Sequence, residues 1–313
     1  MPTDGTGREK EGQAGGLLSD PRWLAAGAGG FGAACLALWA FRGMPLGPVG
    51  FWLAPLPVLM AGMGFGPAAG LGAAALATGA LWLADVHLGP WLFLLGFGIP
   101  TTLLVAASRG GRSLGLPLAL LGMLPAAGIA LAAFWLADMP GGLEGTLAAI
   151  ARSSLSRLDM SVPAEFVTEV VRVKAAAIGF WLSLALAANG WLAGRLLTRF
   201  GIAPAPAWSA ARLPGWYAAL PALAFGLWLA ADAGADAVEL SITLVLLPPL
   251  MLHGLAVLHT RTRGRGERKL LLGAVYVSLL VLFLPASLAV AGYGAFDLIL
   301  RPRGGRPTPR PRS

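Results

Sequence analysis

The feature that most constrains this chain is a repeated pattern of long apolar runs. Runs of about 18 to 25 residues, separated by short polar breaks, fill most of the 313 residues. A run of that length, coiled as α-helix, spans a hydrocarbon core of about 30 Å. Only 12% of the residues are charged, against about 25% in soluble domains. These features exclude a soluble globular protein and predict an all-α, polytopic transmembrane helical bundle.

The breaks predict a transmembrane helical domain over 23–300 between two disordered tails. The first tail, 1–22, is mixed and polar, and the second, 301–313, is basic. We expect about nine spans. The run 270–300 could instead bend at Pro285 and run along the interface, which would leave eight. The nine expected spans are 23–41, 46–63, 67–86, 90–107, 114–137, 175–194, 215–231, 238–259 and 270–293.

Orientation follows from the lysines and arginines between the spans. If the amino terminus is cytoplasmic, thirteen bases lie in inner segments and five in outer ones. The positive-inside rule therefore predicts a multi-pass protein of a bacterial cytoplasmic (inner) membrane with its amino terminus inside. One conflict remains, because nine crossings would place the five arginines of 301–313 outside.

The outer segments carry the acids. Nine acidic residues against five bases give this face a net charge of −4. The acids either solvate the loops or form an electrostatic funnel for cationic solutes. The longest outer segment, 139–174, has apolar residues at helical spacing from Leu147 to Leu158, and Pro163 with Glu165 resembles the start of a second helix. We expect an amphipathic helix on the outer surface here.

Motifs for enzymatic chemistry are not found. Cys35 is the single cysteine, and three histidines do not predict a metal site. Phosphate loops, HExxH and GxSxG are missing, so we expect neither an enzyme nor a cofactor. An enzyme acting at the outer interface through Asp138 or Glu165 stays an alternative. The formal charge of +8 is assigned to membrane orientation, and we expect no nucleic-acid partner.

Prolines near the span centres give the first candidate binding residues. Pro100 and the pair Pro248 and Pro249 each remove a backbone hydrogen bond and free a carbonyl four residues earlier. In lipid such carbonyls need partners or line a cavity, as in transporters with interrupted helices. A midplane cavity and local readjustment of the helices are the two alternatives. Thr101 and Thr102 could satisfy the freed carbonyls or contact a ligand.

Two further polar residues lie within apolar spans. His253 and Asn189 each predict either a hydrogen bond to a neighbouring helix or a contact to a ligand. The candidate substrate-binding residues are thus Pro100, Thr101, Thr102, Asn189, Pro248, Pro249 and His253.

Four segments carry a resemblance to a known family. They are PLPVLMAGMGFG at 55–66, NGWLAGRLLTRFG at 189–201, LMLHGLAVLHTRTRGRGERKLLLGAVYVSLL at 250–280 and GAFDLILRPR at 294–303. The chain resembles the YybS-like family of predicted bacterial membrane proteins, a domain of unknown function. That family is similar in its early helices to substrate-binding membrane subunits of energy-coupling-factor vitamin transporters. The resemblance implies a solute-binding bundle that acts with separate ATPase subunits, and it supplies no catalytic residues.

Two functions from different classes are therefore expected. The first is binding or transport of a small neutral or cationic solute at a midplane pocket, with energy from separate ATPase or other membrane subunits or from an ion gradient. The alternative is a structural or assembly scaffold without transport activity, whose basic loop 261–269 docks anionic lipid or a cytoplasmic partner.

Overall fold

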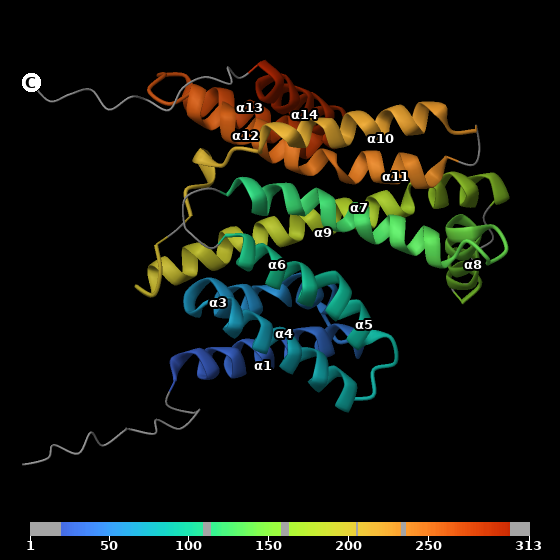
Figure 1. The fold of residues 1–313 in the computed structure, drawn as a ribbon, viewed down its shortest axis with the longest axis horizontal. Coiled ribbons are helices and arrows are strands. Elements are labelled where there is room, and N and C mark those ends of the chain that lie inside the picture. The colour runs from blue at the N-terminus through green and yellow to red at the C-terminus, as the bar shows by residue number, and fades with distance from the viewer. Residues whose placement is uncertain (1–19, 109–113, 158–162, 205, 233–235, 301–313) are drawn as a thin grey trace, which may run out of the picture.

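The computed structural model describes residues 20–108, 114–157, 163–204, 206–232 and 236–300, and every regular element among them is a helix (Figure 1). Seven helices are long and apolar enough to cross a membrane, and two shorter apolar helices accompany them. The predicted all-helical fold is confirmed, and the apolar helices fit the predicted multi-pass membrane protein, whereas the count of nine spans is not confirmed. The tails 1–22 and 301–313 lie almost wholly outside the described residues, and the first helix begins at Pro21.

The first half of the chain forms one group of helices. Asp20 caps the first of them by accepting a hydrogen bond from the Arg22 N–H at 2.9 Å. Small residues then let the backbones approach closely, and a Cβ added at Gly30 would lie 2.8 Å from the Ala73 carbonyl. The helices of this group are α1 (Pro21–Phe41), α2 (Gly47–Leu53), α3 (Pro55–Phe65), α4 (Pro67–Leu83), α5 (Gly89–Phe93), a π-helical turn (Leu94–Gly98) and α6 (Ile99–Ala107).

The second half forms a group that packs on α3 and α6 mainly through α7 and α9. Its longest helix, α9, has 36 residues and is about 54 Å long, so it extends well beyond a hydrocarbon core of about 30 Å. The helices of this group are α7 (Gly115–Trp135), α8 (Gly142–Arg157), α9 (Ala164–Arg199), α10 (Ala219–Ala230), α11 (Ala237–Val245), α12 (Leu247–Arg261), α13 (Arg268–Val281) and α14 (Phe283–Leu300).

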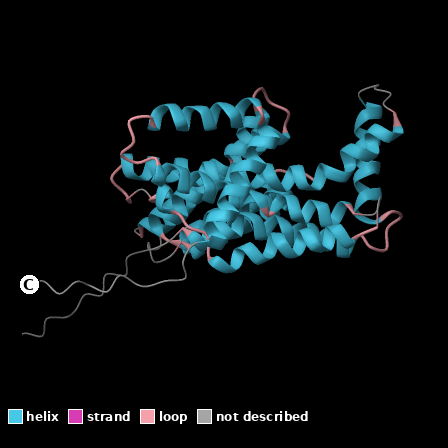
Figure 2. Ribbon diagram, turned by 90° about the horizontal axis from the view of Figure 1, so that it is seen from above, coloured by secondary structure: helices cyan, strands magenta, loops and turns pink. Residues whose placement is uncertain are grey.

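The expected amphipathic segment 139–174 contains two helices. α8 lies across one end of the bundle (Figure 2), and α9 begins at Ala164, next to the start predicted from Pro163 and Glu165. None of the residues of α8 is fully buried. The helix therefore covers the end of the bundle as a surface element.

The two ends of the bundle differ in charge. We call the end where α1 begins and α12 finishes the basic end, because its described residues include nine bases and three acids. The opposite end, which carries α8 and the start of α11, has five bases and eight acids among its described residues and is called the acidic end. The charge segregation expected from the sequence thus appears in the folded chain.

The segment 268–300 is not one continuous helix. It divides at Leu282, whose φ of −115° and ψ of 53° are not helical, three residues before Pro285. The rings of Phe180 and Phe283 are 5.5 Å apart, which places this break beside the middle of α9. α14 then returns to the basic end (Figure 1). There, Asp297 accepts a hydrogen bond from Arg261 at 2.8 Å. The predicted span 270–293 is therefore divided between α13 and α14, which form a helical hairpin, because proline prevents the helix from continuing. α14 by itself is one of the seven helices long enough to cross a membrane.

Some of the other prolines coincide with a break in a helix, and one does not. The helices break at Ala54 before Pro55 and at Leu246 before Pro248, and the π-helical turn comes just before Pro100. Pro125, by contrast, lies inside the continuous helix α7. There, Ser183 of α9 supplies the hydrogen bond that the carbonyl of Leu121 would otherwise lack.

Candidate functional site

Polar side chains from other helices hydrogen-bond to carbonyls at the proline positions. Ser183 Oγ donates to the carbonyl of Leu121 at 2.6 Å, the group that Pro125 leaves without its helical partner. Asn189 Nδ2 donates at 2.8 Å to the carbonyl of Trp52, just before the break between α2 and α3. The hydrogen bond from Ser183 compensates for Pro125, and the one from Asn189 satisfies a carbonyl at the break between α2 and α3. Both carbonyls are therefore occupied by contacts between helices.

A side chain also hydrogen-bonds to the carbonyl at the break between α11 and α12. The Tyr217 hydroxyl donates at 3.0 Å to the carbonyl of Leu246, the residue between the two helices. Pro248 and Pro249, which follow it, are both buried. The ring of Pro249 packs so closely on α7 that a Cβ added at Gly122 would come within 2.9 Å of it.

Thr101 and Thr102 bond back to their own helix. Thr101 Oγ1 is buried and donates to the carbonyls of Phe97 and Gly98, at 2.6 and 3.0 Å. Thr102 Oγ1 donates to the carbonyls of Gly98 and Ile99. Both hydroxyls are thus occupied by the irregular π-helical turn, which favours the structural alternative for these residues over ligand contact.

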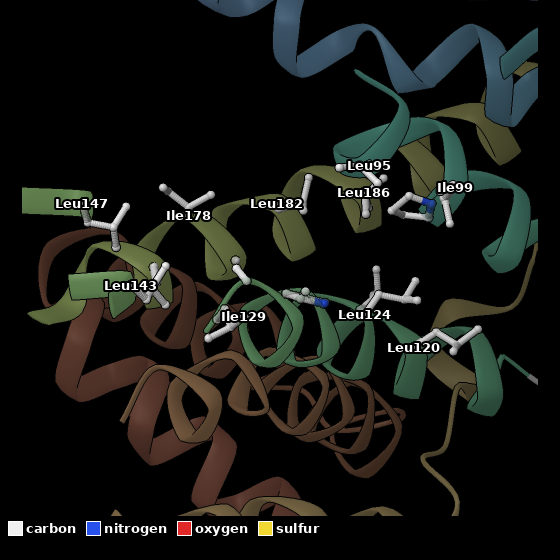
Figure 3. A pocket seen from close by; sticks show the side chains of 17 residues that line it. Leu95, Ile99, Leu120, Leu124, Ile129, Leu143, Leu147, Ile178, Leu182 and Leu186 are labelled. Carbon is white, nitrogen blue, oxygen red and sulfur yellow. The ribbon is translucent and has the colours of Figure 1, made fainter. Parts of the chain in front are cut away.

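An apolar groove of about 310 Å³ lies between α6, α7 and α9 and is partly open. Pro100, Pro125, leucines, isoleucines, alanines and glycines line it. Leu143 and Leu147 of α8 lie at one end of the groove, and Leu120 and Leu124 of α7 lie toward the other (Figure 3). We call it the upper groove; it begins at the acidic end under α8.

A larger cavity of about 540 Å³ follows on the basic side of the same interface. Its walls come from α3, α6, α7, α9 and the loop between Ala203 and Ala211. We call it the lower cavity. It is also mainly apolar, but it includes Ser108 and Trp208. The indole Nε1 of Trp208 is buried and has no hydrogen-bond partner within the described residues, so it offers a donor to a bound molecule.

The upper groove and the lower cavity share two wall residues, Leu121 and Leu186. Leu121 comes from α7 and Leu186 from α9, and both are buried. Two apolar spaces therefore lie in series along the α6–α7–α9 interface, with a leucine layer between them. The hydrogen bond from Ser183 to Leu121 fixes the helices next to this layer.

A cluster of titratable side chains around the partly buried Asp297 lies elsewhere, where α12 and α14 run parallel. Gly254 and Gly294 bring the two backbones into contact. Beside them, His253 Nε2 lies 3.3 Å from Asp297 Oδ2, and the other oxygen of Asp297 accepts from Arg261. In the fold the carboxylate joins α14 to α12.

The candidate residues chosen from the sequence do not meet in one site. Pro100 lines the upper groove, and the other six line neither space. Asn189 ties α9 to α2, and His253 ties α12 to α14. The residues that the sequence did not indicate, Leu186 and Trp208, are an ordinary leucine and a loop tryptophan without any distinguishing motif.

No protein-family model, curated protein or solved structure matches this chain. Within the described residues, no three His, Cys, Asp or Glu side chains are grouped so that they could hold a metal ion. The residues that line the upper groove and the lower cavity therefore indicate what these spaces can bind.

Proposed function

We propose that this chain is a multi-pass bacterial inner-membrane protein that binds an apolar or amphipathic small molecule along the α6–α7–α9 interface and moves it between the two faces. One observation carries the proposal: the upper groove and the lower cavity lie in series and share Leu121 and Leu186. Such a layer separates two half-sites, and a small outward movement of α7 from α9 would join them.

The walls define the class of molecule. Apolar surface binds apolar surface at about 25 cal/mol per Å² removed from water, whereas a polar solute needs paired polar groups. The upper groove has only apolar side chains, and the lower cavity adds Ser108 and Trp208 near the basic end. A molecule with an apolar body and one acceptor group fits these walls better than the cationic solute that is one of the two predicted from the sequence.

The helical hairpin of α13 and α14 supports a specific topology. We count eight crossings before it, from six candidate spans and two shorter apolar helices, and α14 ends at the basic end, where α1 begins. The five arginines of 301–313 then leave the bundle on the side that already holds most bases. This arrangement, with both termini cytoplasmic, removes the conflict that nine crossings created. Energy for directed movement would come from separate ATPase or other membrane subunits at this face, or from an ion gradient.

The test has two parts. The first identifies small molecules that stay bound to the purified protein, and the second fills the lower cavity with a larger side chain. The full chain is purified into nanodiscs, and small molecules that co-purify are identified by mass spectrometry. Ala187→Phe places a ring in the lower cavity, whereas Leu131→Phe changes an exposed position of α7 outside both spaces. We expect Ala187→Phe to lose the retained molecule and its thermal stabilisation, and Leu131→Phe to keep both.

The scaffold alternative predicts different results. It predicts a bundle that retains no specific molecule and whose properties are the same in Ala187→Phe and wild type. It also predicts stable co-purification of other membrane proteins. Those results together would favour the scaffold and contradict the proposed binding function.

A further inference from the structure

A third cavity, of about 290 Å³ and open along one side, lies between α7, α10 and α11, on a different interface from the upper groove and the lower cavity. Its walls include Met123 from α7, Leu220 and Leu223 from α10, and Leu246 beyond the end of α11. All the side chains that line it are apolar except Glu239, in the first turn of α11. One carboxylate therefore faces an otherwise apolar space.

The Glu239 carboxylate is incompletely paired. Its Oε2 is buried and accepts no hydrogen bond from the described residues. An ionised carboxylate can only accept, and leaving a buried one unpaired costs free energy, so the atom favours a ligand that brings a donor or a positive charge.

The nearby acid Asp236 shows the contrast. Arg172 donates to both of its oxygens, one of them from Nε at 2.9 Å, and the indole of Trp228 donates at 2.8 Å. The base that lies close to this turn is thus already engaged by Asp236. Glu239, one turn further along α11, takes part in none of the ion pairs between described residues.

The geometry also gives the ligand a direction. Glu239 lies toward the acidic end, and Leu246 lies seven residues further along, at a rise of about 10 Å toward the middle of the bundle. The first turn of a helix favours negative charge because the backbone dipole is positive there. A cationic head group would meet Glu239, and an apolar chain of similar length would fill the space toward Leu246.

We propose that this cavity is a binding site for an amphipathic organic cation, with Glu239 as the group that pairs with the cationic head. The site does not depend on the function proposed for the α6–α7–α9 interface, because the two share no wall residue. The acidic end, with its excess of acids, would raise the local concentration of cations at the entrance.

The probe is octylammonium, and its matched control is octyl sulfate, which has the same chain and the opposite charge. Titration calorimetry uses the full chain in nanodiscs of zwitterionic lipid, with empty nanodiscs subtracted. We expect saturable binding of octylammonium and none of octyl sulfate. Glu239→Gln should raise the Kd at least about tenfold, since a charged hydrogen-bonded pair contributes that much.

Two more variants make the result decisive. Glu165→Gln removes one exposed acid from the same end, outside the cavity, and should leave the Kd unchanged. Ala126→Leu keeps Glu239 but fills part of the cavity, and it should weaken binding as well. Equal affinity in wild type and Glu239→Gln, equal binding of octyl sulfate, equal losses in Glu239→Gln and Glu165→Gln, or no effect of Ala126→Leu would each overturn the proposal.

Discussion

Ser183 on α9 donates a 2.6 Å hydrogen bond to the carbonyl of Leu121 on α7, the carbonyl that Pro125 deprives of its own helical partner. A defect in one helix is thus compensated by the next, and the compensation fixes the two helices at the layer between the upper groove and the lower cavity. Because there is no water in a bilayer core to satisfy a free carbonyl, this hydrogen bond holds α7 and α9 together.

Ser183→Ala should therefore destabilise the bundle by about 1 kcal/mol, the usual contribution of an interhelical hydrogen bond in a membrane. The measurement is unfolding by denaturing detergent. Ser154→Ala is the control, because Ser154 bonds only to its own helix at the exposed carbonyl of Ile150. It should have almost no effect.

A double-mutant cycle tests the cause. In a Pro125→Ala background, residue 125 regains an N–H that can bond to Leu121, so Ser183→Ala should cost much less than it does in the wild type. Equal costs in the two backgrounds would mean that Ser183 does not compensate for the proline.

The close contact between α12 and α14 predicts which glycine substitutions destabilise the protein. A Cβ at Gly294 would overlap the carbonyl of Leu250, whereas nothing lies within 4 Å of one at Gly292. Gly294→Ala should force the helices apart and destabilise the protein by about 1–3 kcal/mol, and Gly292→Ala should be neutral or slightly stabilising. Thermal unfolding in detergent compares the two variants. Equal melting temperatures would contradict the close contact of α12 and α14 at Gly294.

The acidic end should be sensitive to pH. Hydrogen bonding from Arg172, and then from Trp228, lowers the pKa of Asp236 below its ordinary value. A group whose pKa is lower in the folded state stabilises the fold above its unfolded pKa, about 3.9 for aspartate, and this stabilisation is lost as the pH falls toward the folded value. Because the Arg172 side chain is 36% exposed, we expect a modest effect.

Asp236→Asn should therefore be less stable than the wild type at neutral pH, and the difference should shrink between about pH 5 and pH 3. Melting temperatures of both proteins across this range provide the measurement. A difference that stays constant or grows on acidification would show that the pair with Arg172 is not its source.

Topology can be tested with single cysteines. On a Cys35→Ala background, we expect Thr3→Cys and Arg310→Cys to react on the same, cytoplasmic face and Asp138→Cys to react on the opposite face. The helical hairpin of α13 and α14 requires this result, because it returns the chain to the basic end. Labelling of residue 310 together with residue 138 would instead restore the nine-crossing arrangement.

Much of the fold could be predicted from the chain alone. Apolar runs gave helices at nearly the expected positions, since α1 and α7 begin and end within two residues of the ranges predicted for them. The sequence predicts a bend at Pro285 as the alternative to a ninth span. The consequence of the break, a hairpin pointing back to the basic end, depends on the contact between Phe283 and Phe180.

The candidate site was less predictable for a physical reason. Pro100 could be predicted as a wall residue because a proline disturbs its own helix, and this effect can be predicted from the sequence alone. Leu121, Leu186 and Trp208 have no such property; they line the passage only because helices distant in sequence leave space beside them.

The sequence by itself determined that the chain is a helical membrane bundle with one basic and one acidic end, because hydropathy and charge act residue by residue against lipid and water. Only the tertiary structure decided which carbonyls are satisfied and where space remains. Those features depend on contacts between helices, and the same serine, asparagine or leucine can seal one interface or line another according to the helix that packs against it.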